Sequence, residues 1–170
     1  MHHRKEVERW FLELRVPVIQ YLRRLGCQQS LAEDIAHEAF LRLHHSLRIG
    51  LRVNDVRAWI FRVVRNLWID SRREHQRFWT TSRDEEDRPD LAAVDSSPHP
   101  EQQALDRERS RLMKEEILRL PKLQRECLHL RSQGLRYHEI AAALEISTTA
   151  AVDAVRQAVK RLRSRLAEPS

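Results

Sequence analysis

The last quarter of the chain carries side chains suited to binding a polyanion. Five positively charged residues lie within the ten-residue stretch Arg156–Arg165. Contacts of arginine and lysine with phosphates supply most of the sequence-independent affinity of DNA-binding proteins. Ser147 can cap the helix that contains this stretch. Thr148 and Thr149 lie in its first turn, where hydroxyls and backbone N–H groups can meet phosphates. These residues favour duplex DNA binding over the alternative of a solvated amphipathic helix that only packs on its neighbours.

A second basic cluster, between residues 57 and 77, is interleaved with aromatic side chains. Aromatic rings and guanidinium planes can stack on unstacked bases, so this composition suits single-stranded nucleic acid. Trp59 and Trp68 fall on an apolar stripe and are predicted to be core residues. Phe61, Phe78 and Trp79 are predicted to be freer. The arginines are Arg57, Arg62, Arg65, Arg72, Arg73 and Arg77.

Other chemistry receives little support. Cys27 and Cys127 have no CxxC partner and are predicted to be buried thiols. Nine histidines invite a metal reading, yet His37 and His44 are nearly two helical turns apart, too far for one ion without a third element. The chain has no GxxxxGK, HExxH or GxSxG motif. We therefore predict no catalysis, no cofactor and no metal site.

The elements that must position these residues are helices. Gly is scarce, at 3 residues, and aromatic residues make up 6% of the chain, while Leu, Ala, Arg and Glu dominate. An all-α fold follows. No run approaches the ~18 consecutive apolar residues of a membrane span, and the polar N-terminus does not resemble a signal peptide. We expect a cytoplasmic protein without membrane insertion.

The formal charge divides the chain into three parts. Residues 1–79 and 101–170 carry net charges of +6 and +4, whereas residues 80–100 carry −4. The segment 80–100 also loses helical periodicity and contains three prolines. We predict two small helical domains: an N-terminal bundle (1–79) and a C-terminal helix-turn-helix domain (101–170). An acidic flexible linker (80–100) joins them.

Local signals predict several helix boundaries in the first domain. Pro17 predicts a kink or short break, and Gly26 the end of the first helix. Ser30 and Glu33 form the pattern of a capping box. Asn54 or Asp55 then starts the most apolar helix.

The helix-turn-helix is predicted from a short helix, Tyr137–Leu144, followed by a second helix. The small Ala141 allows the two helices to approach closely. The buried stripe of the second helix is predicted to comprise Ala151, Val155, Ala158, Leu162 and Leu166. Glu145 occupies the turn position where glycine is usual.

Five segments, in order and at suitable spacing, resemble the extracytoplasmic-function (ECF) sigma factors of RNA polymerase. The resemblance covers nearly the whole chain and implies binding to core RNA polymerase and to promoter DNA. The segments are AEDIAHEAFLRL (32–43), DVRAWIFRVVRNLWIDSRR (55–73), PEQQAL (100–105), LPKLQRECLHLRSQGLRYHEIAAALEIS (120–147) and the basic helix that follows.

The resemblance assigns three sets of contact residues. The first would dock on the clamp helices of the largest polymerase subunit: Glu33, Asp34, His37, Glu38 and Phe40, with His37 replacing the family's usual Gln. The second would bind and melt the −10 element: Arg62, Arg65, Asn66, Arg72 and Arg73. The third would read the −35 duplex: Thr148, Thr149, Arg156, Gln157 and Lys160.

Three further expectations come from the resemblance. The loop 49–55 would hold a flipped promoter base. The acidic linker would thread towards the RNA exit channel. The polymerase flap and an anti-sigma factor would be additional partners. In the recognition helix, Val152, Asp153 and Ala154 replace the family's polar and basic residues, which predicts an atypical −35 sequence. A stand-alone helix-turn-helix regulator is the alternative function.

Overall fold

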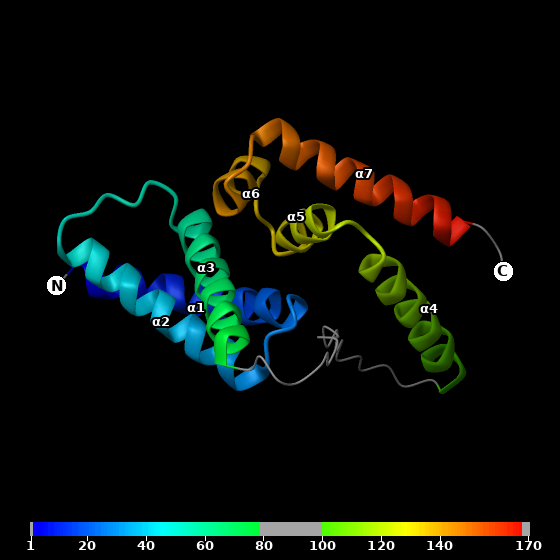
Figure 1. Cartoon of the computed structure of the whole chain (residues 1–170), viewed down its shortest axis with the longest axis horizontal. Coiled ribbons are helices and arrows are strands. Elements are labelled where there is room, and N and C mark those ends of the chain that lie inside the picture. The colour runs from blue at the N-terminus through cyan, green and yellow to red at the C-terminus, as the bar shows by residue number, and fades with distance from the viewer. Residues whose placement is uncertain (1, 79–99, 168–170) are drawn as a thin grey trace.

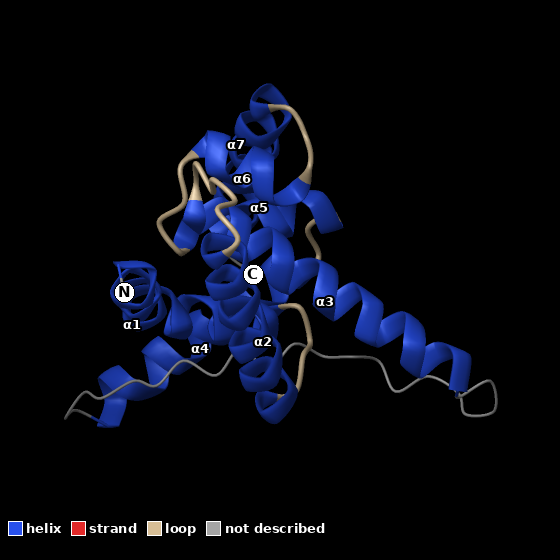
Figure 2. Cartoon of the chain, turned by 90° about the vertical axis from the view of Figure 1, so that its left-hand side faces the viewer, coloured by secondary structure: helices blue, strands red, loops and turns tan. Residues whose placement is uncertain are grey.

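The computed structural model describes residues 2–78 and 100–167, and all the regular structure within these ranges is helical (Figures 1 and 2). The all-α expectation is therefore confirmed. The predicted linker falls almost entirely on residues 79–99, which lie outside the described residues. The helices are α1 (His2–Arg24), α2 (Gln29–Arg48), α3 (Val56–Phe78), α4 (Pro100–Leu118), α5 (Lys122–Ser132), α6 (Tyr137–Leu144) and α7 (Thr148–Ala167).

The N-terminal half is a bundle of α1, α2 and α3, in which each helix packs on the other two. Its core includes Tyr21 and Phe61, both fully buried, whose rings meet edge to face with their centroids 5.4 Å apart. The expectation that Phe61 is free to stack on bases is wrong, because its side chain fills the core against Tyr21. Trp68 is buried, as predicted. The helix α1 runs through Pro17 without a break.

Two of the predicted boundaries in this half are confirmed and one is wrong. Gly26 ends α1 with a φ of 91°, a left-handed conformation that glycine adopts without a Cβ clash. Asp55 caps α3, because its Oδ1 accepts a hydrogen bond from the N–H of Ala58 at 3.0 Å. Ser30 is not the cap of α2. That helix already begins at Gln29, and the Gln29 amide donates to the Glu33 carboxylate at 2.6 Å.

The C-terminal half contains α4 to α7, and the helix-turn-helix formed by α6 and α7 is as predicted. Ala141 is buried where the two helices meet. Glu145 joins them in the left-handed region (φ 58°, ψ 43°). A residue with a Cβ pays roughly 1 kcal/mol or more for this conformation. Ser147 caps α7 by accepting from the N–H of Ala150 at 3.1 Å.

The buried stripe of α7 is shorter than predicted. Ala151, Val155, Ala158 and Leu162 are buried, but Leu166 is 43% exposed. The last turn of α7 therefore extends beyond the helices that cover the rest of it.

The two halves pack directly on each other, which the sequence did not predict. The short helix α6 lies against α3, and α5 lies against the end of α1 (Figure 1). Buried residues from both halves form one continuous cluster that runs from Leu14 and Tyr21 to Leu130 and Ile140. This packing places the C-terminal half over part of the helix that carries the second basic cluster.

Candidate nucleic-acid interface

The exposed face of α7 presents the residues predicted to bind duplex DNA. Thr148, Thr149, Arg156, Gln157 and Lys160 are all exposed. The Arg156 side chain is 76% exposed and lies 3.9 Å from Asp153, a separation at which the ion pair leaves its guanidinium accessible. The Gln157 side-chain oxygen accepts a hydrogen bond from Gln124 at 2.8 Å, which fixes that amide against α5.

The apolar residues in the first turns of α7 are explained in part by core packing and not by altered DNA contacts. Ala151 and Ala154 are both buried, so neither can reach a phosphate or a base edge. The interpretation of Ala154 as a replaced DNA-contact position is therefore not supported by its location. Within residues 151–154, only Val152 and Asp153 reach the surface. On the surface of α7, the departure from the family's polar and basic residues is therefore confined to these two side chains.

Most of the residues predicted to bind the −10 element lie on α3 beyond its buried N-terminal part. Asn66, Arg72 and Arg73 are exposed, and Arg72 lies over the Trp68 ring with 5.7 Å between the guanidinium carbon and the ring centroid. Arg62 is half-buried. The outer part of α3 thus offers exposed polar and cationic groups, which suit the phosphates and base edges of nucleic acid.

Arg65 differs from these exposed residues because its side chain forms an ion pair with Glu126 of the C-terminal half. Its Nε lies 3.1 Å from the Glu126 Oε2, and the two side chains are 21% and 5% exposed. The buried Tyr21 hydroxyl lies beside this pair: burial raises the pKa of Tyr21, the Glu126 carboxylate adds to the rise and Arg65 opposes it. Burial, followed by Glu126, likewise raises the pKa of Cys127 to about 11.

The set predicted to dock on polymerase, on α2, divides into a surface group and a core residue. Glu33, Asp34 and His37 are exposed, and Glu38 pairs with Arg42 at 2.7 Å across one helical turn. Phe40 is 4% exposed and packs edge to face on Phe11. Phe40 therefore holds α2 on α1, and the four polar side chains are the ones that a partner can touch.

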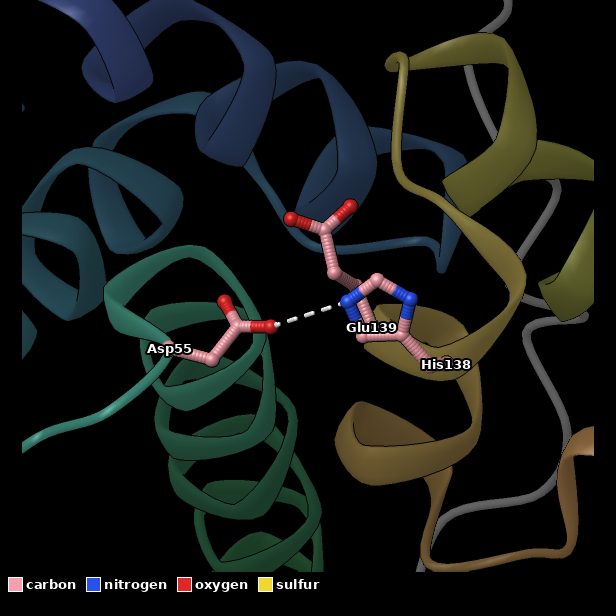
Figure 3. A group of neighbouring side chains, drawn as sticks. All are labelled: Asp55, His138 and Glu139. Carbon is pink, nitrogen blue, oxygen red and sulfur yellow. Dashed lines mark ion pairs between the residues drawn. The ribbon is translucent and has the colours of Figure 1, made fainter.

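A cluster of possible metal ligands lies between the halves, and sequence reasoning missed it. Single ligand atoms of Asp55, His138 and Glu139 lie within 4.8 Å of one another, and His138 Nε2 is 3.7 Å from the Asp55 carboxylate (Figure 3). Asp55 and Glu139 both cap helices: Asp55 accepts from Ala58, and Glu139 from the N–H of Arg136. Helix capping across a domain contact accounts for this cluster without an ion.

The first family comparison concerns the N-terminal half alone. The family model for Sigma-70 region 2 matches residues 10–78, which run from α1 to the end of α3. The match therefore covers the polar face of α2 and all of the basic residues of α3 that the sequence singled out.

Three curated proteins are similar over most of the chain. The RNA polymerase sigma factor SigZ of Bacillus subtilis (strain 168) is 27% identical over 151 residues, covering 88% of this chain and 81% of SigZ. The sigma factor YlaC of the same organism is 24% identical over 145 residues, covering 85% and 82%. The probable sigma factor RfaY of Xanthomonas campestris pv. campestris is 35% identical over 134 residues, which are 78% of this chain but 32% of RfaY.

These matches extend from region 2 into the helix-turn-helix half. The chain is an RNA polymerase sigma factor. A sigma factor binds core RNA polymerase and directs transcription initiation. A solved structure, CnrH in complex with the cytosolic domain of CnrY, shares the fold of this sigma factor, with a TM-score of 0.62 at 20% identity. The alignment covers 98% of this chain and 91% of CnrH. Within the described residues, no helix is long and apolar enough to cross a membrane.

Proposed function

We propose that this sigma factor is of the ECF type and reads promoters with two separate surfaces. Residues 1–79 act as sigma region 2, and residues 101–170 as region 4, joined through residues 80–100. The exposed part of α3, with Asn66, Arg72 and Arg73, binds the melted −10 strand. The exposed face of α7 binds the −35 duplex through its major groove. The chain recruits polymerase and opens DNA, and it catalyses no reaction itself.

The observation that carries this proposal is the placement of two polar, cationic faces on different halves of the chain. The α3 face presents Asn66, Arg72 and Arg73 to solvent, which suits the backbone and base edges of an unpaired strand. The α7 face follows a capped helix start and a left-handed turn, as in duplex-reading helix-turn-helix domains. Together the two faces would let one protein bind a melted −10 strand and a −35 duplex.

The surface of α2 supports a role in docking on polymerase. Glu33, Asp34 and His37 are exposed there, and Glu38 lies beside them, so the clamp helices of the largest subunit would meet a mostly acidic helix face. Loop residues Ile49 and Leu51 are 60% and 53% exposed. They lie in the segment proposed to hold a flipped base, and they would pack on it without an aromatic stack.

In vitro transcription tests the proposal. Core polymerase with the purified chain should initiate at discrete sites on genomic DNA, and Asn66→Ala should reduce initiation while leaving core binding intact. Lys114→Ala, on α4 and outside all three predicted contact sets, is the control and should behave like the unchanged protein. Absence of initiation by a folded chain would exclude the proposed function.

A stand-alone helix-turn-helix regulator is the second candidate, because α6 and α7 alone would satisfy it. The regulator has no need of the clamp helices, so a pull-down with core polymerase separates the two. The double variant Glu33→Lys/Asp34→Lys should abolish retention of polymerase if α2 docks as proposed. Retention that is unchanged by this reversal would contradict the docking role of α2.

An anti-sigma factor is the proposed regulatory partner. The structural relative CnrH is described in complex with the cytosolic domain of CnrY, and the shared fold extends over both of its halves. Such a partner would bind this chain in competition with core polymerase, and a competition pull-down would detect it.

A further inference from the structure

Gln124 and Gln157 form a hydrogen-bonded pair between α5 and the proposed recognition helix α7. The Gln124 Nε2 donates to the Gln157 Oε1 at 2.8 Å. Gln124 is 7% exposed, whereas Gln157 is exposed. An amide held inside the C-terminal half therefore holds a second amide at the surface.

The surroundings of Gln124 decide which way its amide points. Its Oε1 is buried and has no hydrogen-bond partner among the described residues. Reversal of the amide would put the NH2 group in this place and leave two buried donors unpaired instead of one acceptor. Each unpaired buried group is unfavourable, so the arrangement with the nitrogen towards Gln157 is the better one. Gln124 thus donates, and Gln157 accepts through its oxygen.

Gln157 lies at the edge of the face that is proposed to read the −35 duplex. Thr149, Arg156 and Lys160 recur at helical spacing and share one side of α7. Gln157 follows Arg156 by one residue and so lies beside this face, on the side of α5. Because its oxygen is directed at Gln124, its NH2 group is the part of the amide that is left for DNA.

We propose that Gln124 is a positioning residue that makes Gln157 a donor-only reader, which selects guanine over adenine at one position of the −35 element. This inference rests on the proposed function, in which α7 enters the major groove. A glutamine that is free to turn pairs with adenine through both amide atoms, donating to N7 and accepting from the N6 amino group. Guanine presents two acceptors there, N7 and O6, which suit the two N–H donors of the Gln157 NH2 group.

The cost of turning the amide sets the size of this preference. If the Gln157 oxygen turned to accept from adenine, the buried Gln124 Nε2 would lose its partner. An unpaired buried donor shifts such an equilibrium by about 5- to 150-fold. Without that turn, Gln157 makes a single hydrogen bond with adenine, to N7. We therefore expect guanine to be bound at least about fivefold more tightly than adenine at this position.

Selection of duplexes from a random-sequence library tests the inference on the full-length protein and three variants. Gln157→Ala removes the reader, and its effect identifies the base position that this side chain contacts. Gln124→Met keeps an unbranched side chain of similar length that cannot donate to Gln157. Gln133→Met is the matched control, because it makes the same change at the end of α5. Thermal unfolding followed by circular dichroism first confirms that all four proteins are folded.

At the position identified by Gln157→Ala, the unchanged protein and Gln133→Met should both select guanine. Gln124→Met should reduce the preference for guanine over adenine by at least about fivefold, because the released amide can turn and pair with adenine through both atoms. Fluorescence anisotropy on single selected duplexes measures the same preference as a ratio of dissociation constants. A merely structural role of Gln124 would weaken binding to every sequence and leave this ratio unchanged.

Modified bases at the same position test which acceptors are read. Hypoxanthine in place of guanine keeps both N7 and O6, so binding should be retained. In 7-deazaguanine a C–H group replaces N7, so binding should weaken. Retained binding to 7-deazaguanine together with loss on hypoxanthine would contradict reading in the major groove.

Three results of the selection would overturn the inference. Adenine selected by the unchanged protein would mean that the Gln157 oxygen faces the base. The absence of any position that depends on Gln157 would mean that this side chain reads no base. An unchanged preference in Gln124→Met would mean that Gln124 does not orient it. The first two results need only the unchanged protein and a surface substitution, so they do not depend on the folding of Gln124→Met.

Transcription by the unchanged protein with core polymerase, run in parallel, tests the proposed function separately. Absence of initiation refutes that function, while the selection still decides whether Gln157 reads guanine. Initiation together with any of the three overturning results refutes the role of the Gln124–Gln157 pair alone.

Discussion

His129 makes the stability of this protein sensitive to mild acid. The side chain is 5% exposed on α5, and burial lowers the pKa of His129 to about 4, with further lowering from Arg24 and Arg125. In the unfolded chain the imidazole has a pKa of about 6.5. The folded value is depressed, so the unfolded state takes up a proton first as the pH falls. Stability is therefore complete above about pH 7 and decreases as the pH falls from there towards 4.

The size of the effect follows from these two pKa values. At pH 5 the unfolded imidazole is almost fully protonated and the folded one mostly neutral, which costs about 2 kcal/mol relative to pH 7.5. For a chain of this length, this corresponds to a fall in Tm of about 4–8 °C. Thermal unfolding followed by circular dichroism at the two pH values measures it directly.

Two variants separate His129 from the rest of the titration. His129→Gln keeps a polar side chain but cannot be protonated, so its Tm should fall by about 4–8 °C less between pH 7.5 and 5 than that of the unchanged protein. His37→Gln removes an exposed imidazole on α2 and should retain the full fall. If His129→Gln and the unchanged protein lose the same Tm, the buried imidazole does not control the acid response and the reasoning fails.

Four further outcomes are expected from the structure. Phe61→Ala should lower the free energy of unfolding by about 3–5 kcal/mol in denaturant titrations, because it removes a fully buried ring packed on Tyr21; a cost below 1 kcal/mol would contradict the assigned core. Arg156→Ala should weaken binding to a −35 duplex and reduce the slope of log K against log salt by about 0.9, the value for one lost phosphate contact, whereas Lys114→Ala should leave the slope unchanged. Cys127 should resist iodoacetamide at pH 8 in the folded protein, because its thiol is fully buried and its pKa is about 11, and mass spectrometry should detect its alkylation only on opening or unfolding. Glu145→Gly should leave Tm unchanged or raise it slightly, since the relief of left-handed strain, roughly 1 kcal/mol, is offset in part by the greater entropy of glycine in the unfolded chain.

The sequence by itself determined the helices and the turn between α6 and α7. Apolar residues at three- and four-residue spacing and a scarcity of glycine permit little besides packed helices. Local hydrogen bonding fixes Asp55 and Ser147 as caps, and both signals are confirmed. Ser30 failed as a cap because the helix begins two residues earlier than such a cap requires: Gln28 is the N-cap, and Gln29 bonds to Glu33.

The sequence predicted the exposure of some proposed contact residues correctly, but not of all. Thr149, Arg156 and Lys160 lie at helical spacing opposite a buried stripe, so a periodic pattern was enough to place them on the surface. Phe61 could not be placed in this way, because its burial depends on which side of α3 meets α1. Ala154 is a similar case: a small residue is compatible with either face, and only the packing of α7 decided that it is buried.

Only the tertiary structure decided how the two halves meet. Residues 65 and 126 are far apart in the chain, and no periodicity, cap or motif links an arginine on one helix to a glutamate on another. The pair forms because both side chains are buried at one contact, where each requires the opposite charge. Burial is the main cause of the lowered pKa of His129, and Arg24, which comes from the other half, lowers it further. The residues proposed to bind DNA could be identified from the sequence, whereas the contact that pairs Arg65 with Glu126 exists only after folding.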